Sequence, residues 1–159
     1  MKCLSLWQPH AEAIALGLKP FETRGWSTDF RGPLAIHAAK HPLREKDCDW
    51  NWYCEMKKRL ALAGMRLEKL TYGKIVCVVD VVDCVPTAEV RKSWIGRTPI
   101  PPESFWGDFT DRGDDDRLRF AFKLENIRKI PEAHRPAIQG MQGLFNTTKE
   151  VHDEIALWG

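Results

Sequence analysis

Three charged residues with complementary chemistry lie close together near the start of this sequence: Lys19, Glu22 and Arg24. We expect a short turn, stiffened by proline, to bring their side chains together. As a binding site, Arg24 would present a planar fork to a phosphate or a base edge, and Lys19 would add a point charge. The indole of Trp7 or Trp26 would offer a flat face on which a base can stack. This combination favours a pocket for a nucleotide or a segment of RNA.

The same cluster also allows a catalytic or a purely structural role. As a nucleophile, Lys19 would need a pKa lowered by burial or by the neighbouring charge of Arg24, so that its neutral amine can attack an acyl carbon. Glu22 would then carry the proton. Alternatively, the three side chains form an ion-paired turn that only fixes a helix to the sheet. The residue types leave all three roles open.

Further polar residues are candidates for the same pocket. His37 lies on a predicted strand and faces away from its apolar neighbours Ile36 and Ala38, so that it could line the pocket together with Lys40. Alternatively, His37 is a half-exposed histidine at a sheet edge. Gln142 lies in a glycine-rich segment, where the backbone can approach a ligand closely.

The nearly balanced charge argues against a protein that binds nucleic acid or membranes through a strongly basic surface over the whole molecule. The 159 residues include 24 Lys and Arg against 22 Asp and Glu, so an anionic partner must be bound by a local cluster. The five cysteines contain no C-x-x-C pair, which favours reduced thiols over a disulfide framework or a zinc site. We predict no metal site and no cofactor.

The first residues lack the apolar core of a signal peptide, and no stretch approaches the roughly 18 apolar residues of a membrane span. This predicts a cytoplasmic protein without a membrane partner. The acidic residues Asp108, Asp111 and Asp114–Asp116 lack the ligand spacing of an EF-hand loop. They favour a solvated acidic loop that could gate the pocket.

The order of expected elements predicts the fold class. Short alternating segments predict strands at 4–6, 34–38 and 118–126, a β-branched run predicts a central strand at 74–85, and a last strand is expected near 144–146. Helices are expected at 10–16, within 43–70, at 87–92 and at 149–157. The segment 19–29 lacks periodicity. Because no βαβ rhythm is present, we predict an α+β protein: one small mixed β-barrel with flanking helices.

Several segments together resemble the ASCH domain family. These are the segments 5–9, 17–26, 30–40, 73–76, 83–84, 124–126 and 142–146. In the segment 17–26, Gly17, Lys19, Glu22 and Arg24 match the spacing of the family signature. The resemblance implies one PUA-like domain over residues 1–159, with a helical insertion at about 43–70. It also implies an RNA or nucleoside ligand. The residues predicted to bind it are Trp7, Gln8, Lys19, Glu22, Arg24, Trp26, Arg31, His37, Lys40 and Gln142.

The same resemblance leaves two enzymatic alternatives. Short family members resemble amidohydrolases that remove the acetyl group from acetylcytidine, using a lysine, a threonine three residues later and a more distant glutamate. Here Lys19 matches the lysine, Glu22 stands in the threonine position, and Glu89 is a candidate for the distant glutamate. Lys19 and Glu22 are therefore the candidate catalytic residues. The other alternative is a metal-dependent ribonuclease.

Overall fold

The computed structural model describes residues 1–110 and 118–158. Of the predicted acidic loop, Asp111 and Asp114–Asp116 lie outside the described residues. The strands are β1 (Lys2–Leu6), β2 (Phe21–Arg24), β3 (Gly32–Ala38), β4 (Lys74–Pro86), β5 (Phe120–Lys129) and β6 (Leu144–Asn146). The α-helices are α1 (His10–Ala15), α2 (Trp50–Leu62), α3 (Thr87–Lys92) and α4 (Lys149–Ala156).

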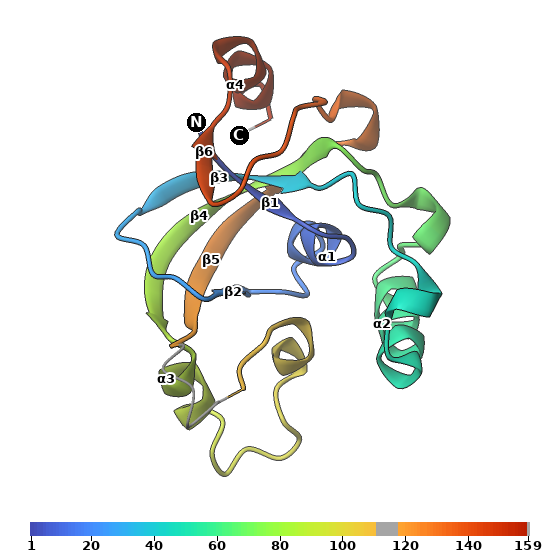
Figure 1. The fold of residues 1–159 in the computed structure, drawn as a ribbon, viewed down its shortest axis with the longest axis vertical. Helices are drawn as coiled ribbons and strands as arrows, with labels where there is room; N and C mark the ends of the chain where they lie inside the picture. The colour runs from blue at the N-terminus through green and yellow to red at the C-terminus, as the bar shows by residue number, and fades with distance from the viewer. Residues whose placement is uncertain (111–117, 159) are drawn as a thin grey trace.

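The strands form one mixed sheet in the order β2-β5-β4-β3-β1-β6. β1 and β3 run parallel, and the other neighbouring strands run antiparallel. The sheet curls around α1, while α2, α3 and α4 lie at the periphery (Figure 1). Because β2 and β6 do not pair within the described chain, the sheet is an open half-barrel. This confirms the predicted α+β class and the barrel-like sheet with flanking helices.

Alternation along the strands divides the core between the two faces of the sheet. Leu34 and Ile36 pack on one face together with Ile14 of α1. Ala35 packs on the opposite face together with Ile155 of α4. Each fully buried Leu or Ile side chain contributes about 1.5–3 kcal/mol to folding. The two layers hold the central strands rigid on both sides.

A buried ion pair anchors α1. The carboxylate of Glu12, which is fully buried, accepts two hydrogen bonds of 2.9 Å from Arg135, and Lys129 Nζ lies 3.3 Å away. The helix ends just before Gly17, whose φ of +75° suits glycine. The position of the loop that follows α1 is therefore fixed at both of its ends, by this anchor and by β2.

The strand β2 corrects the prediction for the segment 19–29. Phe21–Arg24 pairs antiparallel with β5, and Glu22 lies opposite Phe122. Four residues are too few for a period of two to stand out, and the partner strand lies far away in the sequence. The predicted turn was therefore wrong for Glu22 and Arg24: both project from a strand at the sheet edge, and their spacing of two places them on the same face.

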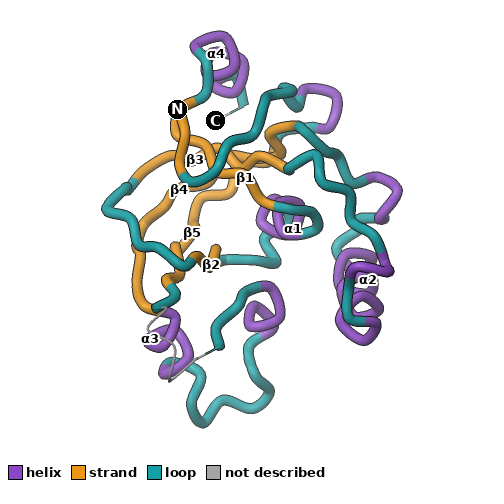
Figure 2. Tube along the Cα trace, in the orientation of Figure 1, coloured by secondary structure: helices purple, strands orange, loops and turns teal. Residues whose placement is uncertain are grey.

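The predicted helical segment 43–70 contains α2, with short 3₁₀ helices at Glu45–Asp47 and Leu67–Lys69. The helix ends at Leu62, two residues before Gly64. Its buried Met56 and Leu60 pack with Trp106. Trp106 belongs to a short helix, Pro102–Trp106, that lies below α1 in Figure 2. No helix within residues 1–110 and 118–158 is long and apolar enough to cross a membrane.

Candidate functional site

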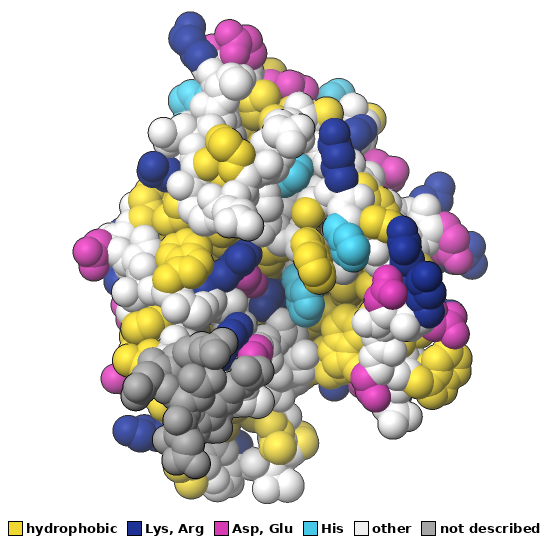
Figure 3. All heavy atoms as spheres, viewed as in Figure 1, with side chains coloured by type: hydrophobic (Ala, Val, Ile, Leu, Met, Phe, Trp, Pro, Cys, Tyr) yellow, Lys and Arg dark blue, Asp and Glu magenta, His cyan; other side chains and the backbone are white. Residues whose placement is uncertain are grey.

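A cavity of about 800 Å³, the first cavity, lies between the end of β1 and the edge strand β2. β6 pairs with β1 only from Lys2 to Leu4. Ser5 and Leu6, at the end of β1, therefore have no partner in β6, and both border the cavity. The volume lies within the roughly 300–1,000 Å³ that small-ligand pockets occupy. Figure 3 shows basic, acidic, histidine and hydrophobic side chains gathered around a hollow near the centre of this face.

The carboxylate of Glu22 joins the two predicted cations. Its Oε2 lies 3.2 Å from Lys19 Nζ, and its Oε1 lies 2.8 Å from Arg24 Nε. The Arg24 Nε–H has no aligned hydrogen-bond partner within the described part of the chain, so its contact with Glu22 is an ion pair held by charge. Arg24 Nη2 also donates to the Ser5 carbonyl at 2.9 Å. The structure therefore brings Lys19, Glu22 and Arg24 together and ties β2 to β1.

Lys19 is nearly sealed, although it lines the cavity. It is 2% exposed, and its Nζ donates to the Trp106 carbonyl at 2.6 Å. Burial lowers the pKa of Lys19, while the negative charge of Glu22 opposes the shift. Arg24 is the more accessible cation, with 26% of its side chain exposed.

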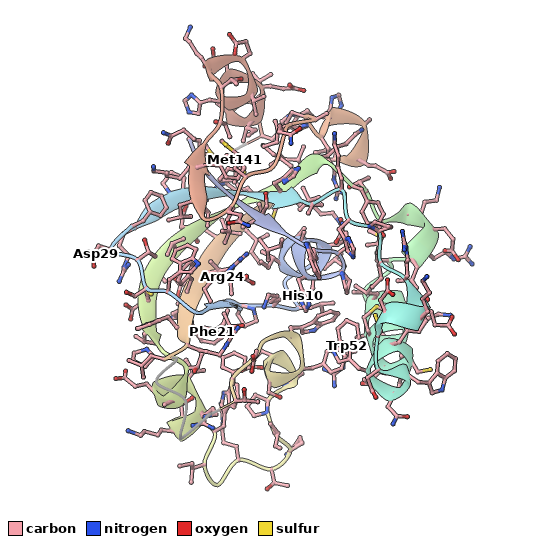
Figure 4. All side chains as sticks on the ribbon, viewed as in Figure 1. His10, Phe21, Arg24, Asp29, Trp52 and Met141 are labelled. Atoms are coloured by element: carbon pink, nitrogen blue, oxygen red, sulfur yellow. The ribbon has the colours of Figure 1, made fainter. Side chains whose placement is uncertain are left out.

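His10, which sequence analysis assigned only to a helix, lines the same cavity. Burial, followed by the positive charge of Lys19, lowers the pKa of His10 to about 4, so the ring is neutral at pH 7. Its Nδ1 is buried without a hydrogen-bond partner among the described residues. In Figure 4, His10 and Arg24 lie near the centre of the view, with Trp52 of α2 beyond His10. In the sequence, His10 could have been connected with the site only through its position directly after the segment 5–9, one of the segments that resemble the ASCH family.

Two predicted indoles lie at the cavity. Trp7 is 63% exposed, and it stacks on His41 with ring centroids 4.5 Å apart and planes 25° apart. Trp26 packs edge-on against Phe122, with centroids 5.1 Å apart. Both side chains are therefore held in place by other rings, while Trp7 keeps most of its surface accessible.

Other lining residues come from segments distant in the sequence. Sequence analysis did not connect Trp52, Phe105, Trp106 and Arg119 with the site, whereas it placed Asp108 in an acidic loop that could gate the pocket. Arg119 Nε lies 3.3 Å from Asp108 Oδ2, and the Asp108 amide donates to Thr23 Oγ1 at 3.0 Å. Asp108 is thus part of the cavity wall. No spacing in the sequence could have revealed this convergence, since it arises from tertiary packing.

The predicted residues His37, Lys40 and Gln142 line a different cavity of about 680 Å³, the second cavity. His37 is 1% exposed, because β3 lies inside the sheet between β1 and β4. The alternative of a half-exposed edge histidine was therefore wrong. His37 Nδ1 lies 2.8 Å from Ser5 Oγ.

Two other predicted residues lie outside both cavities. Gln8 is buried, and its Oε1 accepts from the Glu12 amide at 3.1 Å while its Nε2 donates to the Thr71 carbonyl at 2.8 Å. Arg31 is exposed and pairs with Asp83 at 3.3 Å. The structure gives Gln8 a local role at the start of α1 and brings neither side chain to the cluster.

The two enzymatic alternatives depended on further groups. Glu89, the candidate distant glutamate, is exposed on α3 and lines neither cavity. Within the part of the chain that the structure describes, no three His, Cys, Asp or Glu side chains are grouped so that they could hold a metal ion. The metal-dependent ribonuclease stays a hypothesis.

Comparison with known proteins identifies the family. The model of the ASCH domain matches residues 4–104. The chain belongs to the ASCH domain family. The ASCH match includes the segment with Lys19, Glu22 and Arg24. The assignment of residues 105–159 to the same single domain, and of 43–70 as an insertion, stays a prediction.

Solved structures of ASCH proteins are similar in fold. A crystal structure of ASCH from Zymomonas mobilis is 16% identical, with a TM-score of 0.55 over 98% of this chain and 93% of that chain. A mutant form of the Z. mobilis protein gives 15% identity and a TM-score of 0.51 over 98% and 96%. These likenesses confirm the predicted PUA-like fold. No curated protein matches the chain significantly.

Proposed function

We propose that this ASCH protein binds single-stranded RNA, or a modified nucleoside, in the first cavity. The observation that carries the proposal is the partly exposed Arg24 guanidinium, held by Glu22 and Ser5 beside the indoles of Trp7 and Trp26. Planar cations and aromatic faces are the groups with which proteins recognise unpaired bases and their phosphates.

Arg24 is the residue best placed to contact an anion. A guanidinium carries five N–H donors, and Arg24 uses Nη2 on Ser5 and Nε for its ion pair with Glu22. Donors therefore remain for a phosphate oxygen or a base edge. Arg119, with 27% of its side chain exposed, adds a second cation to the wall. Lys19 supports this arrangement by holding Glu22 from the buried side.

The aromatic side chains supply the base contacts. Stacking of one base on an aromatic side chain contributes about 1–3 kcal/mol and accepts any base. Trp7 is the most accessible platform, and Trp26 lines the same cavity. The unpartnered Nδ1 of His10 offers one polar contact to a base edge.

Binding can be tested with a fluorescently labelled random-sequence ribodecamer. Fluorescence anisotropy would be measured at salt concentrations from about 50 to about 200 mM. We expect Arg24→Ala to weaken binding about tenfold or more and to make the salt dependence shallower by about 0.7 per lost phosphate contact. Arg66→Ala, which removes an exposed arginine outside both cavities, serves as the control. Equal affinities of Arg24→Ala and Arg66→Ala would reject the proposal.

Deacylation of acetylcytidine is a second candidate function, favoured by Lys19. Lys19 lines the cavity, its pKa is lowered by burial, and Glu22 Oε2 lies 3.2 Å from its Nζ to accept a proton. In this reaction the amine attacks the acetyl carbonyl carbon, cytidine leaves, and water releases acetate from the lysine. Glu22 takes the place of the threonine that deacylating family members use.

Acetate release from acetylcytidine, followed by chromatography from about pH 6 to 9, tests the second candidate. Lys19→Arg keeps the positive charge and removes the nucleophile, so we expect it to abolish release. Full activity in Lys19→Arg would exclude Lys19 as the nucleophile. An inactive wild-type protein that still binds RNA would leave binding as the function.

A further inference from the structure

The second cavity is built against a buried polar pair. Its wall contains Ser5 and His37, whose Oγ and Nδ1 lie 2.8 Å apart. Gly140 covers this pair closely, since a Cβ at that position would lie 2.7 Å from both Ser5 Oγ and His37 Cε1. The absence of a side chain at Gly140 lets its backbone lie directly against the pair, of which Ser5 stays partly exposed at the cavity.

Charge and hydrogen-bonding capacity surround this pair. Lys40 and Gln142 are both exposed and line the second cavity. Burial lowers the pKa of His37, so the ring is neutral at pH 7 and its Nδ1 and the Ser5 hydroxyl share one proton. The hydroxyl oxygen keeps a lone pair for a ligand N–H. The second cavity therefore offers a cation, an amide and a hydroxyl to one ligand.

The two cavities share a wall. Ser5, Trp7, Arg24 and Trp26 border both of them. In Figure 4, Arg24 lies below Met141, which lines the second cavity, and to the left of His10, which lines the first. A guanidinium and an exposed indole thus stand at the boundary, which is where a ligand passing from one cavity to the other would cross.

We propose that the ligand is a single-stranded oligonucleotide of at least two nucleotides, with one nucleotide in each cavity and the linking phosphate at Arg24. This inference rests on the proposed function and extends it from one binding pocket to two adjacent subsites. The repeat of a nucleic acid, base then phosphate then base, matches an arrangement in which Arg24 lies between two cavities with aromatic and polar walls.

Competition experiments with short ligands test the two subsites. The probes are the four homodinucleotides ApA, CpC, GpG and UpU and the matching nucleoside monophosphates, each displacing the labelled ribodecamer. We expect at least one dinucleotide to bind about tenfold or more tightly than its monophosphate. Lys40→Ala and Gln142→Ala should lower the affinity for that dinucleotide about threefold to tenfold and leave the affinity for its monophosphate unchanged. Lys69→Ala, an exposed lysine outside both cavities, is the matched control.

The outcomes separate this inference from the proposed function. If a monophosphate competes as well as every dinucleotide and Lys40→Ala has no effect, while Arg24→Ala abolishes binding, the second subsite is refuted and RNA binding stands. If neither the ribodecamer nor any probe binds, the proposed function fails as well. If deoxyribose dinucleotides bind as tightly as the ribose dinucleotides, the two subsites are supported, but selectivity for RNA over DNA is refuted.

Discussion

Arg24 donates from Nη2 to the backbone carbonyl of Ser5 at 2.9 Å, which joins two strands, β2 and β1, that are not neighbours in the sheet. The same guanidinium borders both cavities. Glu22 holds its other side, and Lys19 holds Glu22. The geometry of the candidate site therefore depends on three linked side chains, from the buried Lys19 through Glu22 to Arg24 at the walls of both cavities.

Arg24→Lys tests the planar geometry of the guanidinium group separately from its positive charge. A lysine cannot reach Glu22 and Ser5 at once and still present a planar face. We expect RNA affinity to fall about tenfold, while the slope of affinity against salt stays close to that of the wild type. Anisotropy titrations over a salt series measure both quantities. Wild-type affinity in Arg24→Lys would show that charge alone suffices.

Glu22→Gln tests the buried ion pairs. Without the carboxylate, the Lys19 ammonium and the Arg24 guanidinium share a largely buried space with no compensating anion. We expect the free energy of unfolding to fall by about 3 kcal/mol or more. Urea unfolding measures this change. The double variant Lys19→Met, Glu22→Gln should recover part of the loss, and strict additivity of the two substitutions would contradict the coupling.

His10 should make folding stability depend on acid pH. Its pKa is 6.5 when unperturbed and about 4 in the folded protein. Between these values the unfolded chain binds more protons, so stability falls as the pH falls from 6.5 towards 4, by about 3 kcal/mol at most. In His10→Gln this part of the pH dependence should vanish. Urea unfolding of both proteins at several pH values checks this, and parallel stability curves would rule out the assigned shift.

Gly140→Ala should crowd the second cavity. The added methyl group would meet Ser5 Oγ and His37 Cε1 at 2.7 Å, and His37 is buried inside the sheet. We expect a loss of about 1–3 kcal/mol in thermal or urea unfolding. Gly25→Ala is the control, because its Cβ would have no neighbour within 4 Å, and it should change stability by less than about 0.5 kcal/mol. Equal stability of the two variants would mean that Gly140 is not closely packed.

Local patterns predicted most of the fold. The β-branched run at 74–85 indicated β4, and the helix expected at 10–16 corresponds to α1, because these signals act within a few residues. β2 could not be predicted, since its strand conformation depends on pairing with the distant β5. The cluster of Lys19, Glu22 and Arg24 was apparent from spacing, whereas Arg119 reaches the cavity only through tertiary packing.

The most direct test of the account is to observe the tryptophan indole N–H signals by NMR while the ribodecamer is added. Substitutions Trp7→Phe, Trp26→Phe and Trp50→Phe assign the three signals. We predict that the Trp7 and Trp26 signals shift with RNA, while that of Trp50, which is 61% exposed on α2 and outside both cavities, stays in place. Shifts confined to Trp50, or no shift at any of the three, would contradict binding in the first cavity.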